Sequence, residues 1–332
     1  MQDSMSLHNE TYHMKGDSPI EEQENNVLNL VMSLFFFITS PVGILGNSIF
    51  LWTLGFRMRK TVNTVLFSSL VLSGLSYSMI MPILGVYVLQ DFTWTYGTVL
   101  CKLVNTLISL CMYASVFILT IVSLDRYILV VHPVWARSFR TPQRALVITV
   151  AVWISAFMLS APYLAFRVVR PGEKNKSTCS NNYMFSDDWD DQEIQSGRRK
   201  IHLCFFLIRL LLGFLIPFLI ITACYGNTAF KVKIRRLSRS SKFIKVIVVS
   251  VLSFFVCWLP YHIFYALSMY REYYPELLIQ VVMSMAIVCS CANVCFTPIF
   301  YLFIGENFKA IFKKSLLSLI ESTFGEECDL TV

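Results

Sequence analysis

Two charged groups lie in long apolar stretches of this 332-residue chain. Arg209 is surrounded by Leu, Phe and Ile and precedes Pro217 by eight residues, and the triplet Asp125-Arg126-Tyr127 stands near the end of another apolar stretch. A charge in apolar surroundings is costly unless it is paired and hydrogen-bonded. Both groups are therefore candidate sites for recognising a charged partner.

The two arginines suggest different chemistry. No acidic residue in an apolar stretch offers Arg209 a partner at the same depth, so we expect a ligand carboxylate or another anionic ligand group. Water in a crevice could also solvate Arg209. Arg126 has Asp125 beside it, and a charge-assisted pair between them could act as a latch that an entering partner breaks. Alternatively, Arg126 only reaches the membrane interface and switches nothing.

The ten cysteines predict one bridge and no metal site. Most lie within apolar stretches, where cysteine is a small packing residue. Cys101 and Cys179 lie on the side predicted below to be extracellular, so we expect a disulfide between them. No Cys/His spacing matches a zinc site, and no set of nucleophile and base indicates an enzyme. The sequence implies no cofactor.

Composition identifies the elements that must position these groups. The chain is 55% hydrophobic and 15% charged, with a mean hydropathy of +0.59, against about 25% charged in average soluble domains. Apolar runs without period-two alternation predict an all-α membrane protein, a bundle of seven transmembrane helices. The predicted spans are 28–56, 62–89, 98–131, 144–166, 201–231, 242–268 and 277–303, and an amphipathic eighth helix is predicted at about 305–316. The predicted divisions are an N-terminal tail over 1–27, the seven-helix domain over 28–303, and the eighth helix with a cytoplasmic tail over 304–332.

Charge predicts the orientation of the bundle. Lys and Arg crowd the first, third and fifth links and the eighth helix, so these face the cytosol and the N-terminus is extracellular. The glycosylation triplets at Asn9 and Asn175 both fall outside in this topology. The net charge of +7 is concentrated beside the membrane, which favours anionic membrane lipid over nucleic acid as a partner. Ser238 follows two arginines on a cytosolic link and is a candidate phosphorylation site, although such serines also occur by chance.

An ordered set of motifs resembles the rhodopsin-like (class A) G-protein-coupled receptors. The resemblance covers nearly the whole chain, with one or two motifs in each of six spans: Gly46-Asn47, Cys101 with Asp125-Arg126-Tyr127, Trp153, Pro217 with Tyr225, the run FFVCWLP, and Pro298 with Tyr301. The runs RKTVNTVLF, RLLLGFLIPF, SKFIKVI and GENFKAIFKKS are similar to the chemoattractant branch, which includes the formyl-peptide, anaphylatoxin and chemerin receptors.

The resemblance implies a plasma-membrane receptor that binds its ligand between the outer helix ends and activates a heterotrimeric G protein of the inhibitory class inside. The helical periodicity of the spans suggests which residues face the ligand pocket, and Arg209 would bind an anionic group of the ligand. The suggested lining is Leu84, Tyr87, Ser109, Met112, Tyr113, Tyr261, His262, Tyr265 and Met283. The switch and coupling residues would be Asp125, Arg126, Tyr127, Val134, Tyr225, Phe254, Trp258, Pro260, Pro298 and Tyr301.

An acidic outer loop suggests the ligand class. Asp187, Asp188, Asp190, Asp191 and Glu193 would attract a cationic partner, whereas Arg209 needs an anion. A chemoattractant-type peptide or small protein with a basic body and a terminal carboxylate satisfies both. Alternatively, the acids only solvate the loop.

Two positions depart from the family pattern. Gly74 stands where the family usually has Asp, and Thr297 stands where it has Asn. Without that carboxylate we expect no sodium site, although Asn47, Ser115 and Asn293 are present. These departures keep open a non-signalling or scavenging receptor. Ile108 stands where amine receptors carry an Asp, and Cys291 stands where retinal receptors carry a Lys, so we expect neither kind of ligand. A transporter would show inverted repeats or broken helices, and the sequence indicates neither.

Overall fold

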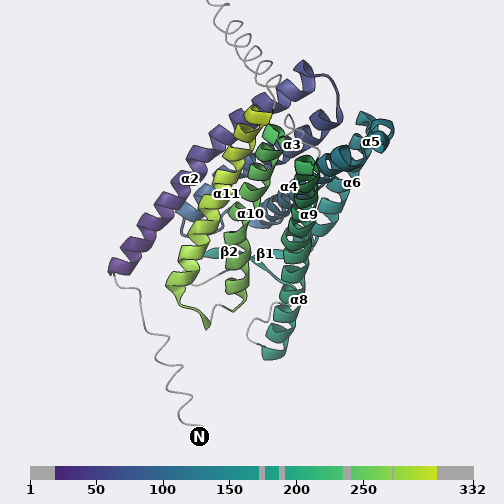
Figure 1. Cartoon of the computed structure of the whole chain (residues 1–332). Helices are drawn as coiled ribbons and strands as arrows, with labels where there is room; N and C mark the ends of the chain where they lie inside the picture. Colours follow the sequence, from purple (N-terminus) through teal and green to yellow (C-terminus); the bar gives the residue numbers. More distant parts are fainter. Residues whose placement is uncertain (1–18, 172–175, 187–190, 235–240, 271–272, 305–332) are drawn as a thin grey trace, which may run out of the picture.

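The computed structural model describes residues 19–171, 176–186, 191–234, 241–270 and 273–304. Seven of the described helices are long and apolar enough to cross a membrane, which confirms the predicted bundle (Figure 1). The predicted eighth helix, the triplet asparagines Asn9 and Asn175, the candidate phosphorylation site Ser238 and most of the acidic loop lie outside the described residues.

The helices follow the predicted spans closely. Helix α3 has its predicted bounds, and a capping box between Thr61 and Thr64 explains its start. Helix α6 begins after Thr141, whose side chain accepts from the Arg144 backbone. The helices are α2 (Pro19–Trp52), α3 (Val62–Leu89), α4 (Gly97–Val131), α5 (Pro133–Phe139), α6 (Pro142–Ser160), α7 (Pro162–Phe166), α8 (Gln192–Leu210), α9 (Ile216–Ile234), α10 (Ser241–Met269) and α11 (Glu276–Ile304), with short π-helical turns η1 (Thr53–Arg57) and η3 (Leu211–Leu215).

Two helices begin well before the predicted spans. Helix α2 starts at Pro19 instead of 28, and α8 starts at Gln192 instead of 201. The side chain of Asp191 caps α8 by accepting from the Glu193 and Ile194 backbone amides at 2.7 and 3.2 Å. Hydropathy marks where a helix becomes apolar, whereas caps and helix-forming polar residues decide where it begins.

Helix α4 forms the centre of the core. Its buried side chains pack against α3, α6, α9 and α10, and residues from all these helices join one apolar cluster. Trp258 and Phe254 of α10 belong to the same cluster, with 5.9 Å between their ring centroids. The core therefore connects the residues predicted for signalling directly to α4.

A two-stranded hairpin packs against the N-terminal end of α4. Strands β1 (Arg167–Pro171) and β2 (Ser177–Asn181) pair antiparallel, and a disulfide joins Cys179 of β2 to Cys101 at the start of α4. The predicted bridge is therefore present. The strands were not predicted, because a short hairpin linked through a disulfide leaves no hydropathy signal.

Candidate functional site

Arg209 occupies the last turn of α8, just before the π-helical turn η3. It is 97% buried. A π-helical turn rotates the residues that follow it and is frequent at functional sites. Within it, a Cβ on Gly213 would stand 3.0 Å from Met112 and 3.1 Å from Tyr113. The glycine thus lets α4 approach closely beside Arg209.

Aromatic rings enclose the Arg209 guanidinium. Its central carbon lies 4.7 Å from the ring centroid of Tyr261, 5.7 Å from that of Tyr163 and 5.8 Å from that of Tyr265. Nη1 donates to the Tyr163 hydroxyl, and Nη2 lies 3.6 Å from the Met112 sulfur. Cation–π contacts stabilise a desolvated guanidinium by about 2 kcal/mol or more. The rings therefore hold the cation without neutralising it.

The cation retains unused bonding capacity. Among the described residues, no carboxylate lies within ion-pair distance of Arg209, and its Nε has no hydrogen-bond partner. The same holds, within that part of the chain, for both ring nitrogens of His262 and the Ser109 hydroxyl. A cavity of about 180 Å³ adjoins Arg209, lined partly by Tyr113, Tyr163 and Tyr183. The geometry suits an anionic end group.

The loop after β2 closes one side of this site. Tyr183 is buried, and its hydroxyl lies 3.4 Å from that of Tyr265. Its ring stacks on that of Phe205 with 5.5 Å between the ring centroids, and its centroid lies 5.4 Å from that of the His202 ring. Burial raises the pKa of the Tyr183 phenol to about 12, so this ring remains neutral beside the cation.

The structure brings some predicted lining residues to Arg209 and not others. Met112, Tyr113, Tyr261 and Tyr265 lie around it, and His262 packs on Phe214 and Tyr261 nearby. Ser109 is buried on α4.

Three predicted lining residues occupy other clusters. Leu84 and Met283 pack with buried residues of α2, α3 and α11, and Tyr87 packs on Phe92 and Trp94. Sequence reasoning missed Tyr163, Tyr183 and His202. Tyr163 follows Pro162, the first residue of α7, and that Pro-Tyr pair was the available signal.

A second site lies at the other end of the bundle, around Asp125. Its carboxylate lies 2.7 Å from Arg126 Nη2 and 2.8 Å from Arg140 Nε. Both arginines also donate to the Asn63 side chain of α3, Arg140 at 2.5 Å. The expected Asp125–Arg126 pair is present, and Arg140 and Asn63 extend it into a four-residue polar cluster that the sequence did not suggest.

The remaining predicted switch residues that the structure describes lie between the two sites or at the Asp125 end of the bundle. The Ser123 hydroxyl of α4 is 3.2 Å from that of Tyr225 on α9, one turn from Arg126. The ring centroids of Trp258 and Tyr261 lie 5.6 Å apart in an edge-to-face contact, and Pro260 lies inside α10. Val134 of α5 is 81% exposed, Tyr127 is half-buried on α4, and the side chains of Pro298 and Tyr301 on α11 lie outside the description.

The region of Gly74 is closely packed. A Cβ on Gly74 would stand 2.9 Å from Asn47 Oδ1, and Ser73 and Ser115 hydrogen-bond to each other at 2.7 Å. Asn47 donates to the Gly43 carbonyl, while its own Oδ1 accepts from no described group. No group of three His, Cys, Asp or Glu residues in the described part of the chain could hold a metal ion. The loss of the sodium site stays a prediction.

Comparisons with known proteins agree with this architecture. The family described as "7 transmembrane receptor (rhodopsin family)" matches residues 46–301. The human "Probable G-protein coupled receptor 33" is 44% identical over 97% of this chain and 98% of its own, and its mouse counterpart is 43% identical over 89% and 86%. The "Chemerin-like receptor 1" of Rattus norvegicus is 34% identical over 97% and 89%. The chain therefore belongs to the rhodopsin family of seven-transmembrane G-protein-coupled receptors.

Proposed function

We propose that this receptor binds an extracellular peptide or small protein through a carboxylate that contacts Arg209, and activates an inhibitory-class heterotrimeric G protein. The observation that carries the proposal is the buried Arg209 guanidinium. Tyrosines enclose it, and no described carboxylate neutralises it. The N-terminus lies outside the plasma membrane in this proposal, and the C-terminus lies inside.

Size favours the end of a larger ligand. Small-molecule pockets usually measure about 300–1,000 Å³, whereas the cavity beside Arg209 measures about 180 Å³. A terminal residue fits such a space while the rest of a peptide remains near the loop. Asp191 and Glu193 supply negative charge there, which favours a basic ligand body. One relative is named a chemerin-like receptor, which supports the small-protein class.

The proposed signal passes through α10 to the inner end. Tyr261 contacts both Arg209 and Trp258, so a carboxylate that draws Arg209 away from Tyr261 changes the packing of Trp258 and Phe254. A ligand with higher affinity for the open state then shifts the population toward it. In that state Arg126 leaves Asp125, and the exposed Val134 inserts into the G protein.

A screen tests this function. Cells that express the receptor are exposed to peptides with free C-termini and to amidated counterparts, and inhibition of cyclic AMP formation is measured. We expect agonists among the free acids, with loss of response in Arg126→Ala while binding persists. Agonists that act equally well as acids and amides would contradict the carboxylate contact.

The second candidate is a non-signalling or scavenging receptor. The packing of Asn47 against Gly74 favours it, because that glycine replaces the usual acid of the inner polar cluster. This candidate predicts that a bound peptide is internalised without a change in cyclic AMP. Measuring uptake of a fluorescent hit from the screen alongside cyclic AMP distinguishes the two.

A further inference from the structure

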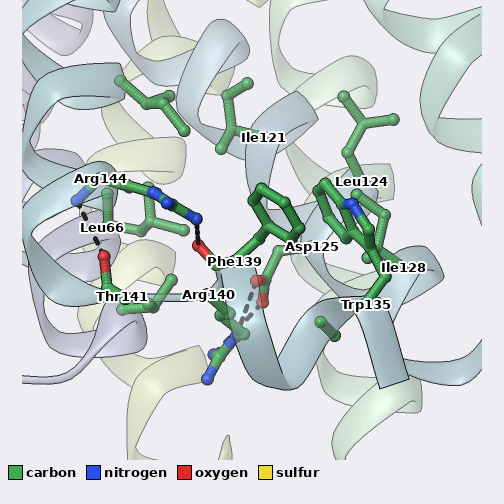
Figure 2. Close-up of a pocket in the computed structure, with 14 residues that line it drawn as sticks. Leu66, Ile121, Leu124, Asp125, Ile128, Trp135, Phe139, Arg140, Thr141 and Arg144 are labelled. Atoms are coloured by element: carbon green, nitrogen blue, oxygen red, sulfur yellow. Dashed lines mark hydrogen bonds and ion pairs between the residues drawn. The ribbon is translucent and has the colours of Figure 1, made fainter. Parts of the chain in front are cut away.

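A groove of about 220 Å³ lies beside Asp125 and Arg140, and Figure 2 draws the residues that line it. Helices α3, α4 and α6 form its walls, and the short helix α5 covers it. Its deep wall is apolar and includes Leu66 and Ile121. The rings of Trp135 and Phe139, both in the lining, stack with their centroids 4.6 Å apart. The proposed receptor function uses Asp125 of this lining and assigns no ligand to the space itself.

Several apolar residues of the groove lining are exposed at the surface of the bundle. Trp135, Phe139 and Ile148 line the groove and remain 51%, 45% and 41% exposed. Ile148 continues into the exposed apolar side of α6, where Val147 is 69% exposed. In a helix that crosses the bilayer, such a side contacts acyl chains. An acyl chain can therefore enter the groove without crossing water.

Charges at the rim favour an anionic headgroup. Arg144 is exposed, donates to the Phe139 carbonyl at 3.1 Å, and has no ion-pair partner in the described part of the chain. The sequence contains no acidic residue from Arg126 to Gly172. Asp125, the single acid in the groove lining, already carries two arginines. The rim is thus cationic.

We propose that this groove binds one acyl chain of an anionic cytosolic-leaflet phospholipid, with the headgroup at Arg144. The space is smaller than the usual small-molecule pocket of about 300–1,000 Å³, which suits a segment of one linear chain. Figure 2 shows the ring pair and the Asp125–Arg140 pair beside each other in the groove. The lipid therefore braces α5 and holds Arg140 toward Asp125.

Photolabelling tests the proposal independently of any agonist or G protein. The receptor is placed in phosphatidylcholine nanodiscs that contain phosphatidylserine with a diazirine on one chain, or phosphatidylcholine with the same chain. We expect labelled peptides within 135–148. One basic residue near an anionic lipid contributes about 1 kcal/mol, or about fivefold in binding. Arg144→Gln should lower phosphatidylserine labelling by that factor, while Arg57→Gln, at the inner end of the first span, should not.

A groove-filling variant tests the chain contact. Ile148→Trp should reduce labelling by both probes, whereas Val147→Trp, on the exposed side of the same helix, should preserve it. Equal labelling of these two variants, or no preference for phosphatidylserine in the wild type, would overturn the proposal. Glycerophosphoserine has the headgroup without chains; strong competition by it would also overturn chain binding. Arg144 is exposed, so its variant tests the proposal even if Ile148→Trp does not fold.

Discussion

Replacing Asp125 with Asn tests the role of the carboxylate in the four-residue polar cluster around Asp125. The side chain keeps its shape and loses its charge, so both the contact to Arg126 at 2.7 Å and that to Arg140 at 2.8 Å lose their charge assistance. Arg126 and Arg140 then share Asn63 without a carboxylate between them. We expect the inner end to open more often.

The size of the effect follows from the burial of the pairs. A hydrogen bond to a charged group contributes about 1.5–3 kcal/mol. These side chains are 12% to 26% exposed, so screening by water lowers the contribution of each charged hydrogen bond. We therefore take about 2 kcal/mol for the loss of both pairs. This is a change of about 30-fold in the equilibrium. An open state of about 1% would rise to about one fifth.

Basal G-protein activity measures this change. Wild type and Asp125→Asn are compared at equal surface expression, through cyclic AMP formation without added ligand. Asp91→Asn is the matched control, because Asp91 lies beyond the end of α3, away from Asp125, and is half exposed beside Lys176. Basal activity that is raised by Asp125→Asn and not by Asp91→Asn supports the latch. No difference among the three proteins would refute it.

Three further predictions concern other parts of the bundle. Tyr163→Phe should lower the potency of a free-acid agonist about tenfold or more in the cyclic AMP assay, because the Tyr163 hydroxyl bonds the charged Arg209; an unchanged potency would contradict this. Cys101→Ala removes a bridge between residues 78 positions apart and should destabilise the receptor by about 4–5 kcal/mol, seen as a lower melting temperature in detergent. Gly74→Ala should destabilise the receptor by about 1–3 kcal/mol and lower the same melting temperature, because the new Cβ would meet Asn47. Gly55→Ala is the control and should leave the melting temperature unchanged, because a Cβ there meets nothing within 4 Å.

The sequence was sufficient to predict the spans and the two charged centres. A run of apolar residues has to be a helix in a bilayer, because its backbone must bond internally. Charges within such runs then identify Arg209 and Arg126. Helix α3 matched its predicted start because a threonine capping box coincides with the start of the apolar run.

The partners of those charges could not be predicted, because they depend on how distant elements pack. Tyr163 reaches Arg209 from the short helix α7, which begins at Pro162, and Arg140 reaches Asp125 from the end of α5, fifteen positions further along the chain. Helical periodicity predicts which face of a helix a residue occupies. It does not predict how neighbouring helices cross, and that crossing brings the Tyr261 ring centroid within 4.7 Å of the Arg209 guanidinium. The early start of α8 likewise depends on one cap at Asp191.

The most direct measurement of the central claim is a double-mutant cycle between Arg209 and a ligand carboxylate. A free-acid peptide agonist and its C-terminal amide are compared on wild type and Arg209→Ala, with Lys200→Ala as a control for charge loss on the exposed side of the same helix. Truncating one partner of a buried charge pair costs about 2–5 kcal/mol. Arg209→Ala and amidation should therefore each cost at least about 30-fold in potency, with little further loss when combined. Independent, additive losses would show that the carboxylate and Arg209 do not meet.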